Sequence, residues 1–295
     1  MLKIKEIIRK IIGRFSPKLL VNILYYISNK EFIDWKNPRN LNEKIQWLKF
    51  YSDTSLWPDL ADKYKVRLYV ESLGLSAILV ELYGVWDSVD KIDWNSLPKS
   101  YVMKVNNGCG DVRICKNGDV DVEKMKCHFS KALKLKIGNW RGEPHYNKIK
   151  PLIIAEELLD KNQQSIESSS LIDYKFWCCD GIPYCVLCCS NRHGKNISFS
   201  LYDMNWNNIN EEIQESEHYK CAEYDIPKPK SFEYMVEIVK TLSSPFPHVR
   251  VDLYEISGKP YFGELTFTPA GGYVSYFKKK FLIDLGSKIT IKSVK

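Results

Sequence analysis

Four polar side chains in the segment 249–267 have the types and spacing needed for chemistry on a phosphate group. The segment has the sequence VRVDLYEISGKPYFGELTF, two apolar-rich runs joined by Ser-Gly, which predicts a β-hairpin. Side chains two residues apart share a face of a strand, so Arg250 lies with Asp252, and Glu264 lies with Thr266. Two converging carboxylates suit Mg²⁺, which prefers hard oxygen ligands, and an arginine can hold phosphate bidentately. The alternative is a solvent-facing hairpin with cross-strand ion pairs.

The length of the hairpin loop decides whether these four side chains meet. A two-residue loop at Ser257-Gly258 is expected to place the two pairs on opposite faces. A three-residue loop at 256–258, with glycine in the left-handed conformation, pairs Glu255 with Lys259 and brings all four polar groups to one face. The magnesium interpretation therefore needs the longer loop.

A glycine-rich segment, NNGCG at 106–110, is a second candidate for phosphate binding. It follows a predicted strand that includes Lys104 and leads into another predicted strand. The glycines let backbone N–H groups approach an anion closely. The spacing matches neither a Walker A loop nor a dinucleotide fingerprint, because no helix follows. An ordinary glycine-rich turn is the alternative.

The rest of the chain alternates hairpins with helices. Helices are predicted at 41–51, with Asn40 as N-cap, and at 58–73, 122–138 and 232–244. Strands are predicted within 77–87, 101–105 and 152–159, with hairpins at 112–122, 173–189 and 248–267, whereas 190–230 is expected to form loops with short elements. This order predicts an α+β fold with antiparallel sheets.

The net charge of +7 is concentrated at the two ends of the chain. Residues 1–18 contain six bases and one acid, and residues 277–295 contain six bases and one acid, whereas 19–276 contain 31 bases and 34 acids. A nucleic-acid-binding protein usually has its positive charge on a face of the fold, so we expect no nucleic-acid partner.

The first segment predicts a basic amphipathic helix. Its apolar residues follow the spacing of one helical face: Ile4, Ile7, Ile8, Ile11 and Phe15. Such a helix either lies on an anionic membrane surface through residues 1–18 or docks on the protein's own core. No apolar run approaches the ~18 residues of a membrane span, and no signal peptide is expected.

The nine cysteines indicate a reducing compartment, because an odd number with adjacent pairs makes a poor disulfide framework. Cys185 and Cys188 form a CxxC but have no second half-site for zinc. The stretch YCVLCC is better explained as a buried strand in which cysteine acts as a small hydrophobe. We therefore expect a cytoplasmic protein, with a peripheral position on the inner face of the cytoplasmic membrane if the first helix binds lipid.

Taken together, these segments resemble the TupA-like branch of the ATP-grasp superfamily, which is found in bacterial teichuronopeptide and capsular polysaccharide gene clusters. The resemblance covers residues from about 30 nearly to the end. It rests on NPRNLNEKIQWLKFY (37–51), WPDLADKYKVRLYV (57–70), LYGVWDSVDKIDW (82–94), YVMKVNNGCG (101–110), EPHY (143–146), PLIIAEELL (151–159), DYKFWCCDG (173–181) and VRVDLYEISGKPYFGELTFTPAGG (249–272).

The resemblance implies a role for each matching residue. Lys63 and Lys104 would bind the ATP phosphates, Gly108 and Gly110 would cover them, Glu156 and Leu159 would contact adenine, and Asp173 with Lys175 would form an acidic-x-basic pair facing phosphate or the acyl group. Arg250 would stabilise the transferred phosphoryl group, and Asp252 and Glu264 would bind Mg²⁺. Thr266 occupies a position where many ATP-grasp enzymes have asparagine as a third metal ligand. His145, Tyr146 and Arg192 are candidates for binding the acceptor or deprotonating the amine, and a packed structural histidine is the alternative for His145.

The implied protein is an ATP- and Mg²⁺-dependent carboxylate–amine ligase that acts through an acyl phosphate. Its expected substrates are a hexuronic acid carboxylate of a surface glycan, or of its lipid-linked precursor, and an amino acid or amine. The expected organisation is a helical segment (1–60) followed by two α+β subdomains with largely antiparallel sheets that clasp ATP. These are an N-terminal subdomain (61–150) with the glycine-rich loop and a C-terminal subdomain (151–295) with the metal site.

Two other classes of function remain open at this stage. The first is a glycan kinase or a glycosyltransferase of the same pathway, although the DxD at Asp119–Asp121 lies beside an Asn-Gly turn rather than after a parallel strand. The second is a non-catalytic assembly protein, which would not require the lysines, arginine and carboxylates together.

Overall fold

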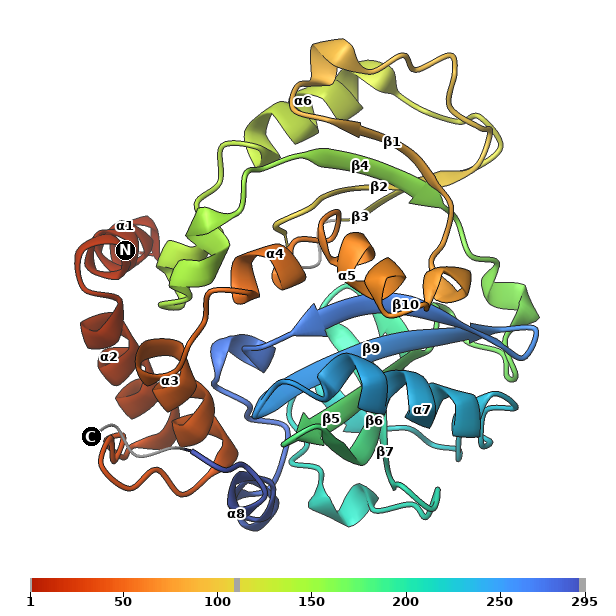
Figure 1. The fold of residues 1–295 in the computed structure, drawn as a ribbon. Coiled ribbons are helices and arrows are strands. Elements are labelled where there is room, and N and C mark those ends of the chain that lie inside the picture. Colours follow the sequence, from red (N-terminus) through yellow and green to blue (C-terminus); the bar gives the residue numbers. More distant parts are fainter. Residues whose placement is uncertain (1, 109–111, 292–295) are drawn as a thin grey trace.

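Helices form one side of the molecule in the computed structural model, which describes residues 2–108 and 112–291, with side chains from Glu6 onward. These are α1 (Leu2–Phe15), α2 (Pro17–Asn29) and α3 (Leu41–Tyr51) (Figure 1). Helix α3 has the predicted bounds and cap: Glu43 N donates to Asn40 Oδ1 at 3.0 Å, and the Glu43 carboxylate accepts from Asn40 N at 3.3 Å. This capping box explains why the helix begins where the sequence predicts.

The first sheet has four antiparallel strands in the order β1-β4-β2-β3. Their bounds are β1 (Leu82–Trp86), β2 (Tyr101–Val105), β3 (Val112–Cys115) and β4 (Ile153–Glu157). Helix α6 (Val122–Ala132) packs on this sheet through Met125 and Phe129, which share a core with Met103. Strand β4 belongs to this sheet although it lies after residue 150, so the two sheets do not divide the chain there.

The second sheet has six strands in the order β10-β9-β5-β6-β7-β8, all antiparallel except the parallel pair β7 and β8. Their bounds are β5 (Asp173–Cys179), β6 (Ile182–His193), β7 (Asn196–Asp203), β8 (Tyr219–Cys221), β9 (His248–Ile256) and β10 (Lys259–Thr266), with α7 (Phe232–Ser243) packed on β9 and β6 and α8 (Lys279–Ser287) near α3. The prediction of loops over 190–230 is wrong for β7. Its apolar residues recur at every second position, but the intervening serines resemble a loop.

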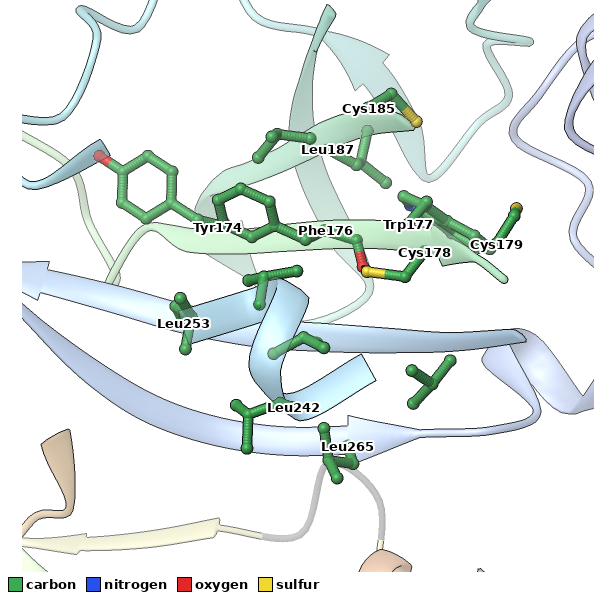
Figure 2. Packing of buried hydrophobic residues seen from close by; sticks show 14 of the residues in the cluster. Tyr174, Phe176, Trp177, Cys178, Cys179, Cys185, Leu187, Leu242, Leu253 and Leu265 are labelled. Carbon is green, nitrogen blue, oxygen red and sulfur yellow. The ribbon is translucent and has the colours of Figure 1, made fainter. Parts of the chain in front are cut away.

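The main core lies on the second sheet and contains most of the cysteines (Figure 2). Five are buried in β5 and β6, packed among Phe176, Trp177 and Leu187: Cys178, Cys179, Cys185, Cys188 and Cys189. Burial raises the pKa of the Cys189 thiol to about 12, so it is protonated and unreactive. The described residues contain no group of three or more His, Cys, Asp or Glu placed to hold a metal. The burial of Cys185, Cys188 and Cys189 on β6 confirms the interpretation of YCVLCC as a buried strand.

The helix predicted at 58–73 is two helices, α4 (Trp57–Ala61) and α5 (Val66–Ser72). The break occurs at Asp62, whose backbone is extended (φ −75°, ψ 114°) and whose carboxylate accepts a hydrogen bond from Tyr64 N at 2.8 Å. A short side chain that bonds its neighbouring backbone competes with helix continuation. The break places Lys63 between the two helices, from where its side chain reaches the candidate site described below.

The β9–β10 hairpin has the shorter of the two loops considered, but its polar side chains lie together as was expected only for the longer one. The loop has two residues, Ser257 and Gly258, with φ of 52° and 76°, so Ile256 pairs with Lys259. The three-residue loop is therefore wrong, and so is the conclusion that a two-residue loop separates the polar groups. A β-bulge at Gly263 adds one residue to β10, which shifts the register by one and returns its polar side chains to the face of β9 that bears Asp252.

Gly263 is needed because the bulge leaves no room for a side chain. A Cβ there would lie 2.9 Å from the carbonyl oxygen of Asp252 and 3.1 Å from Cε2 of Tyr254.

Among the helices of the described residues, none is both long enough and apolar enough to cross a membrane.

Candidate functional site

A row of three charged residues crosses three neighbouring strands of the second sheet. Lys175 on β5 pairs in register with Asp252 on β9, which pairs with Glu264 on β10. Register partners project from the same face, so the three side chains lie next to one another. Lys175 Nζ donates to Asp252 Oδ2. The bulge at Gly263 is what completes this row.

Arg250 binds all three predicted metal ligands. Its Nε and Nη2 donate to the two oxygens of Asp252 at 2.6 and 2.7 Å, a bidentate pair, and Nη2 also lies 3.2 Å from Glu264 Oε1 and 3.1 Å from Thr266 Oγ1. Thr266 Oγ1 in turn donates to Glu264 Oε1 at 3.0 Å. Arg250 and Asp252 are both buried, so their opposite charges compensate each other where water is scarce.

Lys63 reaches this group from the break between α4 and α5. Its Nζ lies 3.2 Å from Glu264 Oε2 and donates to the Gly108 carbonyl at 2.7 Å, which links β10 to the glycine-rich segment. Its backbone N donates to the Asn106 carbonyl at 3.0 Å. The helix break therefore positions Lys63 between the two sheets.

Asn106 is a positioning residue that the sequence does not single out. Its side chain is buried, accepts from Leu152 N at 2.8 Å and donates to the Lys150 carbonyl at 3.0 Å. These bonds fix the base of the glycine-rich segment to the chain that enters β4. The signal available in the sequence was an asparagine directly after a strand, a position that suits side-chain-to-backbone bonds.

A second charged group lies on the first sheet. Lys104 Nζ on β2 is 2.5 Å from Glu156 Oε2 on β4, and Arg67 Nη1 on α5 is 3.4 Å from Glu156 Oε1. Arg67 also donates to the Val80 carbonyl at 2.7 Å. Arg67 was missed from the sequence, because 89 residues separate it from Glu156. Glu156, predicted near adenine, is here the anionic partner of two cations.

Asp173, at the start of β5, accepts from Arg192 and lies 3.4 Å from Lys175 Nζ. Its negative charge, with burial, raises the pKa of the neighbouring Tyr254 well above its ordinary value, so this hydroxyl is a donor. We call the whole group the charged cluster. It has four cations, three carboxylates and a hydroxyl: Lys63, Lys175, Arg192, Arg250, Asp173, Asp252, Glu264 and Thr266.

The electrostatics keep Glu264 and Lys175 ionised. Burial alone would raise the pKa of Glu264, but the charges of Lys63, Arg250 and Lys175 outweigh it and hold the pKa below its usual range. Burial would likewise lower the pKa of Lys175, and Asp173 and Asp252 reverse this and raise it. One net positive charge remains, which suits an anionic ligand.

The donor set of the charged cluster fits Mg²⁺ bound to a polyphosphate. Asp252 and Glu264 would provide carboxylate oxygens and Thr266 a hydroxyl, all hard ligands, and none is a nitrogen or sulfur donor that would favour zinc. The cations that now contact these carboxylates, Lys63, Lys175 and Arg250, are suited to hold phosphate oxygens.

The remaining predicted residues lie elsewhere. His145 is buried, with its ring edge-on to Trp57 at 5.3 Å, and burial followed by the charge of Lys49 lowers its pKa to about 3. Within the described residues, none of the hydrogen bonds of the charged cluster involves His145, so its catalytic role stays a prediction. Leu159 follows β4 and is half-buried, and Gly110 lies outside the described residues.

The sequence matches a known family, and the fold is similar to several solved ligases at low sequence identity. Residues 43–290 match the family described as TupA-like ATPgrasp. The D-alanine–D-alanine ligase of Helicobacter pylori is 15% identical with a TM-score of 0.43, covering 85% of this chain and 69% of that one. The corresponding ligase of Bacillus anthracis complexed with ATP is 14% identical with a TM-score of 0.43, covering 78% and 61%.

The L-amino acid ligase of Bacillus licheniformis is 10% identical, with a TM-score of 0.49 and coverage of 88% and 57%. This chain thus spans about two thirds or less of the length of these three proteins. No curated protein matches the sequence.

Proposed function

This chain belongs to the TupA-like ATP-grasp family, and on that premise we propose that it is an ATP- and Mg²⁺-dependent ligase that joins a carboxylate to an amine. Its fold is accordingly the α+β ATP-grasp fold, with two largely antiparallel sheets and a helical N-terminal segment. The single observation that supports the activity most strongly is the charged cluster, in which buried Arg250 contacts the two candidate metal carboxylates and the threonine.

Five residues of the charged cluster, together with Lys104 of the first sheet, have separate tasks in this proposal. Mg-ATP would supply the phosphoryl group that converts the substrate carboxylate into an acyl phosphate, so that phosphate rather than oxide departs when the amine attacks. Asp252 and Glu264 would hold the metal and orient the polyphosphate. Lys63 and Lys104 would neutralise phosphate charge, and Arg250 would stabilise the charge that develops on the transferred group. Lys175 would orient the acyl oxygen.

The substrate in this proposal is a hexuronic acid carboxylate of a bacterial surface polysaccharide or its precursor, and the nucleophile is an amino acid or amine. This choice rests on the resemblance to proteins of teichuronopeptide and capsular polysaccharide clusters. The net positive charge of the whole charged cluster, four cations against three carboxylates, supports an anionic acceptor. Arg192 is more exposed than the rest and is suited to contact a second carboxylate.

The test is incubation with Mg-ATP, a uronic-acid glycan and a pool of amines, with ADP release and glycan mass as readouts. A ligase releases ADP only when an amine is present and adds the amine mass minus water. A stable phosphorylated glycan would instead identify a kinase, and absence of nucleotide binding would refute both.

The matched variants are Asp252→Asn with Glu264→Gln, and as control Asp119→Asn with Glu237→Gln, two exposed carboxylates outside the charged cluster. We expect the first pair to abolish turnover while the thermal unfolding midpoint shows a folded protein, and the control to keep full activity. Full activity of the first pair would refute the metal assignment.

A further inference from the structure

Helix α1 contacts the rest of the protein through its polar side. A Cβ at Gly13 would lie 2.0 Å from the Asn139 carbonyl oxygen, so the backbones are in close contact there, and Arg9 Nε donates to the Trp140 carbonyl at 2.5 Å. An amphipathic helix of a globular protein normally buries its apolar stripe. In α1 the orientation is the reverse, so the alternative in which its apolar stripe docks on the protein's own core does not hold.

The apolar stripe of α1 consequently faces solvent, and so do apolar side chains on one side of α2 and in the turn after it, whereas the other side of α2 is buried through Leu20, Val21 and Tyr25. Ile7 is 55% exposed, Phe15 77% and Phe32 73%. The full set, which we call the α1–α2 apolar surface, is Ile7, Ile8, Ile11, Phe15, Leu19, Ile23, Tyr26, Ile27 and Phe32. Most follow at intervals of three or four residues, which places them on one side of each helix. Figure 1 shows α1 and α2 at the outer edge of the molecule, away from both sheets.

Basic residues border this surface. Lys10 and Arg14 are exposed on α1, and Lys30 is exposed at the end of α2. Residues 6–39 contain seven bases against three acids. One of these acids, Glu31, lies 2.5 Å from Lys279 Nζ at the start of α8. This ion pair places the basic start of α8 near the turn after α2, where Lys279 lies between the exposed Lys278 and Lys280.

We propose that the α1–α2 apolar surface docks on an anionic lipid bilayer, with the apolar side chains entering the headgroup region and the bases pairing with lipid phosphates. Large exposed apolar patches mark interaction sites, and the combination with bordering positive charge matches the known chemistry of interfacial helices. Each base near such a surface strengthens binding by about fivefold. The proposal does not depend on the ligase activity, because vesicle binding needs neither ATP nor substrate.

The experiment is flotation of the full chain with vesicles of phosphatidylglycerol and phosphatidylcholine, compared with phosphatidylcholine alone. We expect binding to the anionic vesicles that weakens as salt is raised. The apolar variant is Ile11→Asp with Phe15→Asp, and its control is Leu68→Asp with Ile182→Asp, two side chains that are 65% and 53% exposed elsewhere. We expect at least about tenfold weaker partitioning for the first pair and no change for the control.

The charge variant is Lys10→Glu with Arg14→Glu, with Lys195→Glu and Lys240→Glu as exposed controls. We expect the first pair to lose at least about tenfold in partitioning to anionic vesicles. The proposal is overturned if the full chain does not float with anionic vesicles, or if the control pairs lose as much as the test pairs. It is also overturned if sedimentation shows a dimer that Ile11→Asp with Phe15→Asp dissociates, since a second copy would then cover the surface.

Discussion

Replacing Gly263 with alanine is the most direct test of how the fold builds the charged cluster. The added Cβ would lie 2.9 Å from the Asp252 carbonyl oxygen, a distance that real Cβ atoms essentially never show. That oxygen belongs to β9, which is paired on both sides, so the bulge in β10 must move instead. Forcing an extra methyl group into packed structure costs about 1–3 kcal/mol.

The functional loss should exceed the loss of stability. If the bulge shifts, Glu264 moves relative to Asp252, and a misplacement of about 1 Å at a reacting centre costs about 10²-fold in rate. If the bulge is lost altogether, the register slips by one residue and both Glu264 and Thr266 turn to the opposite face. We therefore expect Mg-ATP turnover to fall by about 100-fold or more.

The assay is ADP release under saturating Mg-ATP, with urea unfolding measured in parallel. Gly74→Ala is the matched control. Gly74 has φ of +74°, and no atom lies within 4 Å of the position that its Cβ would take, so alanine there costs about 1–2 kcal/mol through backbone strain alone. We expect the control to lose stability and keep its turnover. Turnover equal to wild type in Gly263→Ala would refute the conclusion that the bulge positions Glu264.

The site and its supports lead to three further predictions. Lys63→Met should weaken ATP binding by about 10- to 100-fold in calorimetric titration, because a charged partner of phosphate is lost. The control Lys65→Met removes only a surface ion pair with Asp59 and should leave the affinity unchanged. Equal affinities of the two variants for ATP would contradict the role of Lys63. Asn106→Ala should lower the free energy of unfolding by about 1–3 kcal/mol, since two part-buried hydrogen bonds to backbone groups are lost, and a loss below about 0.5 kcal/mol in urea unfolding would count against it. Burial lowers the pKa of His145 to about 3 and of His248 to about 4, below the ordinary 6.5, so below about pH 6 the unfolded chain binds two protons that the folded chain does not. The free energy of unfolding should therefore fall with decreasing pH, by about 2–3 kcal/mol per unit between pH 5.5 and 4.5, and a flat profile would contradict this assignment.

Features that depend on a few neighbouring residues were predictable from the sequence. The cap at Asn40 needs only Glu43 three residues later, and the turn at Asp180-Gly181 needs only two residues that tolerate φ of 48° and 76°. The bulge at Gly263 is different, because its cause is the approach of β9, which no local pattern contains. The grouping of the four polar residues of the hairpin was expected only with a three-residue loop, and the bulge that groups them with a two-residue loop was not predicted.

Contacts between residues far apart in the sequence and the orientation of helix α1 were also not predictable from the sequence. Glu156 was assigned from the resemblance, but its contact with Arg67 depends on how α5 lies against β4. The amphipathic pattern of α1 was evident, whereas the side that faces the protein depends on the close contact at Gly13. Helical periodicity identifies the apolar face without saying what covers it.

The cysteines of β5 and β6 give the protein a built-in chemical reporter of its own opening. Thiol reagents reach Cys178 or Cys189 only after the second sheet separates, and a global opening free energy of about 5 kcal/mol slows that modification by at least about 10³-fold. Cys127 on α6 is exposed and reacts in the native state, which provides an internal reference. Mass spectrometry would follow how fast the buried thiols are modified, with and without Mg-ATP. The ratio of the two rates would measure how strongly the nucleotide stabilises the sheet that bears the charged cluster.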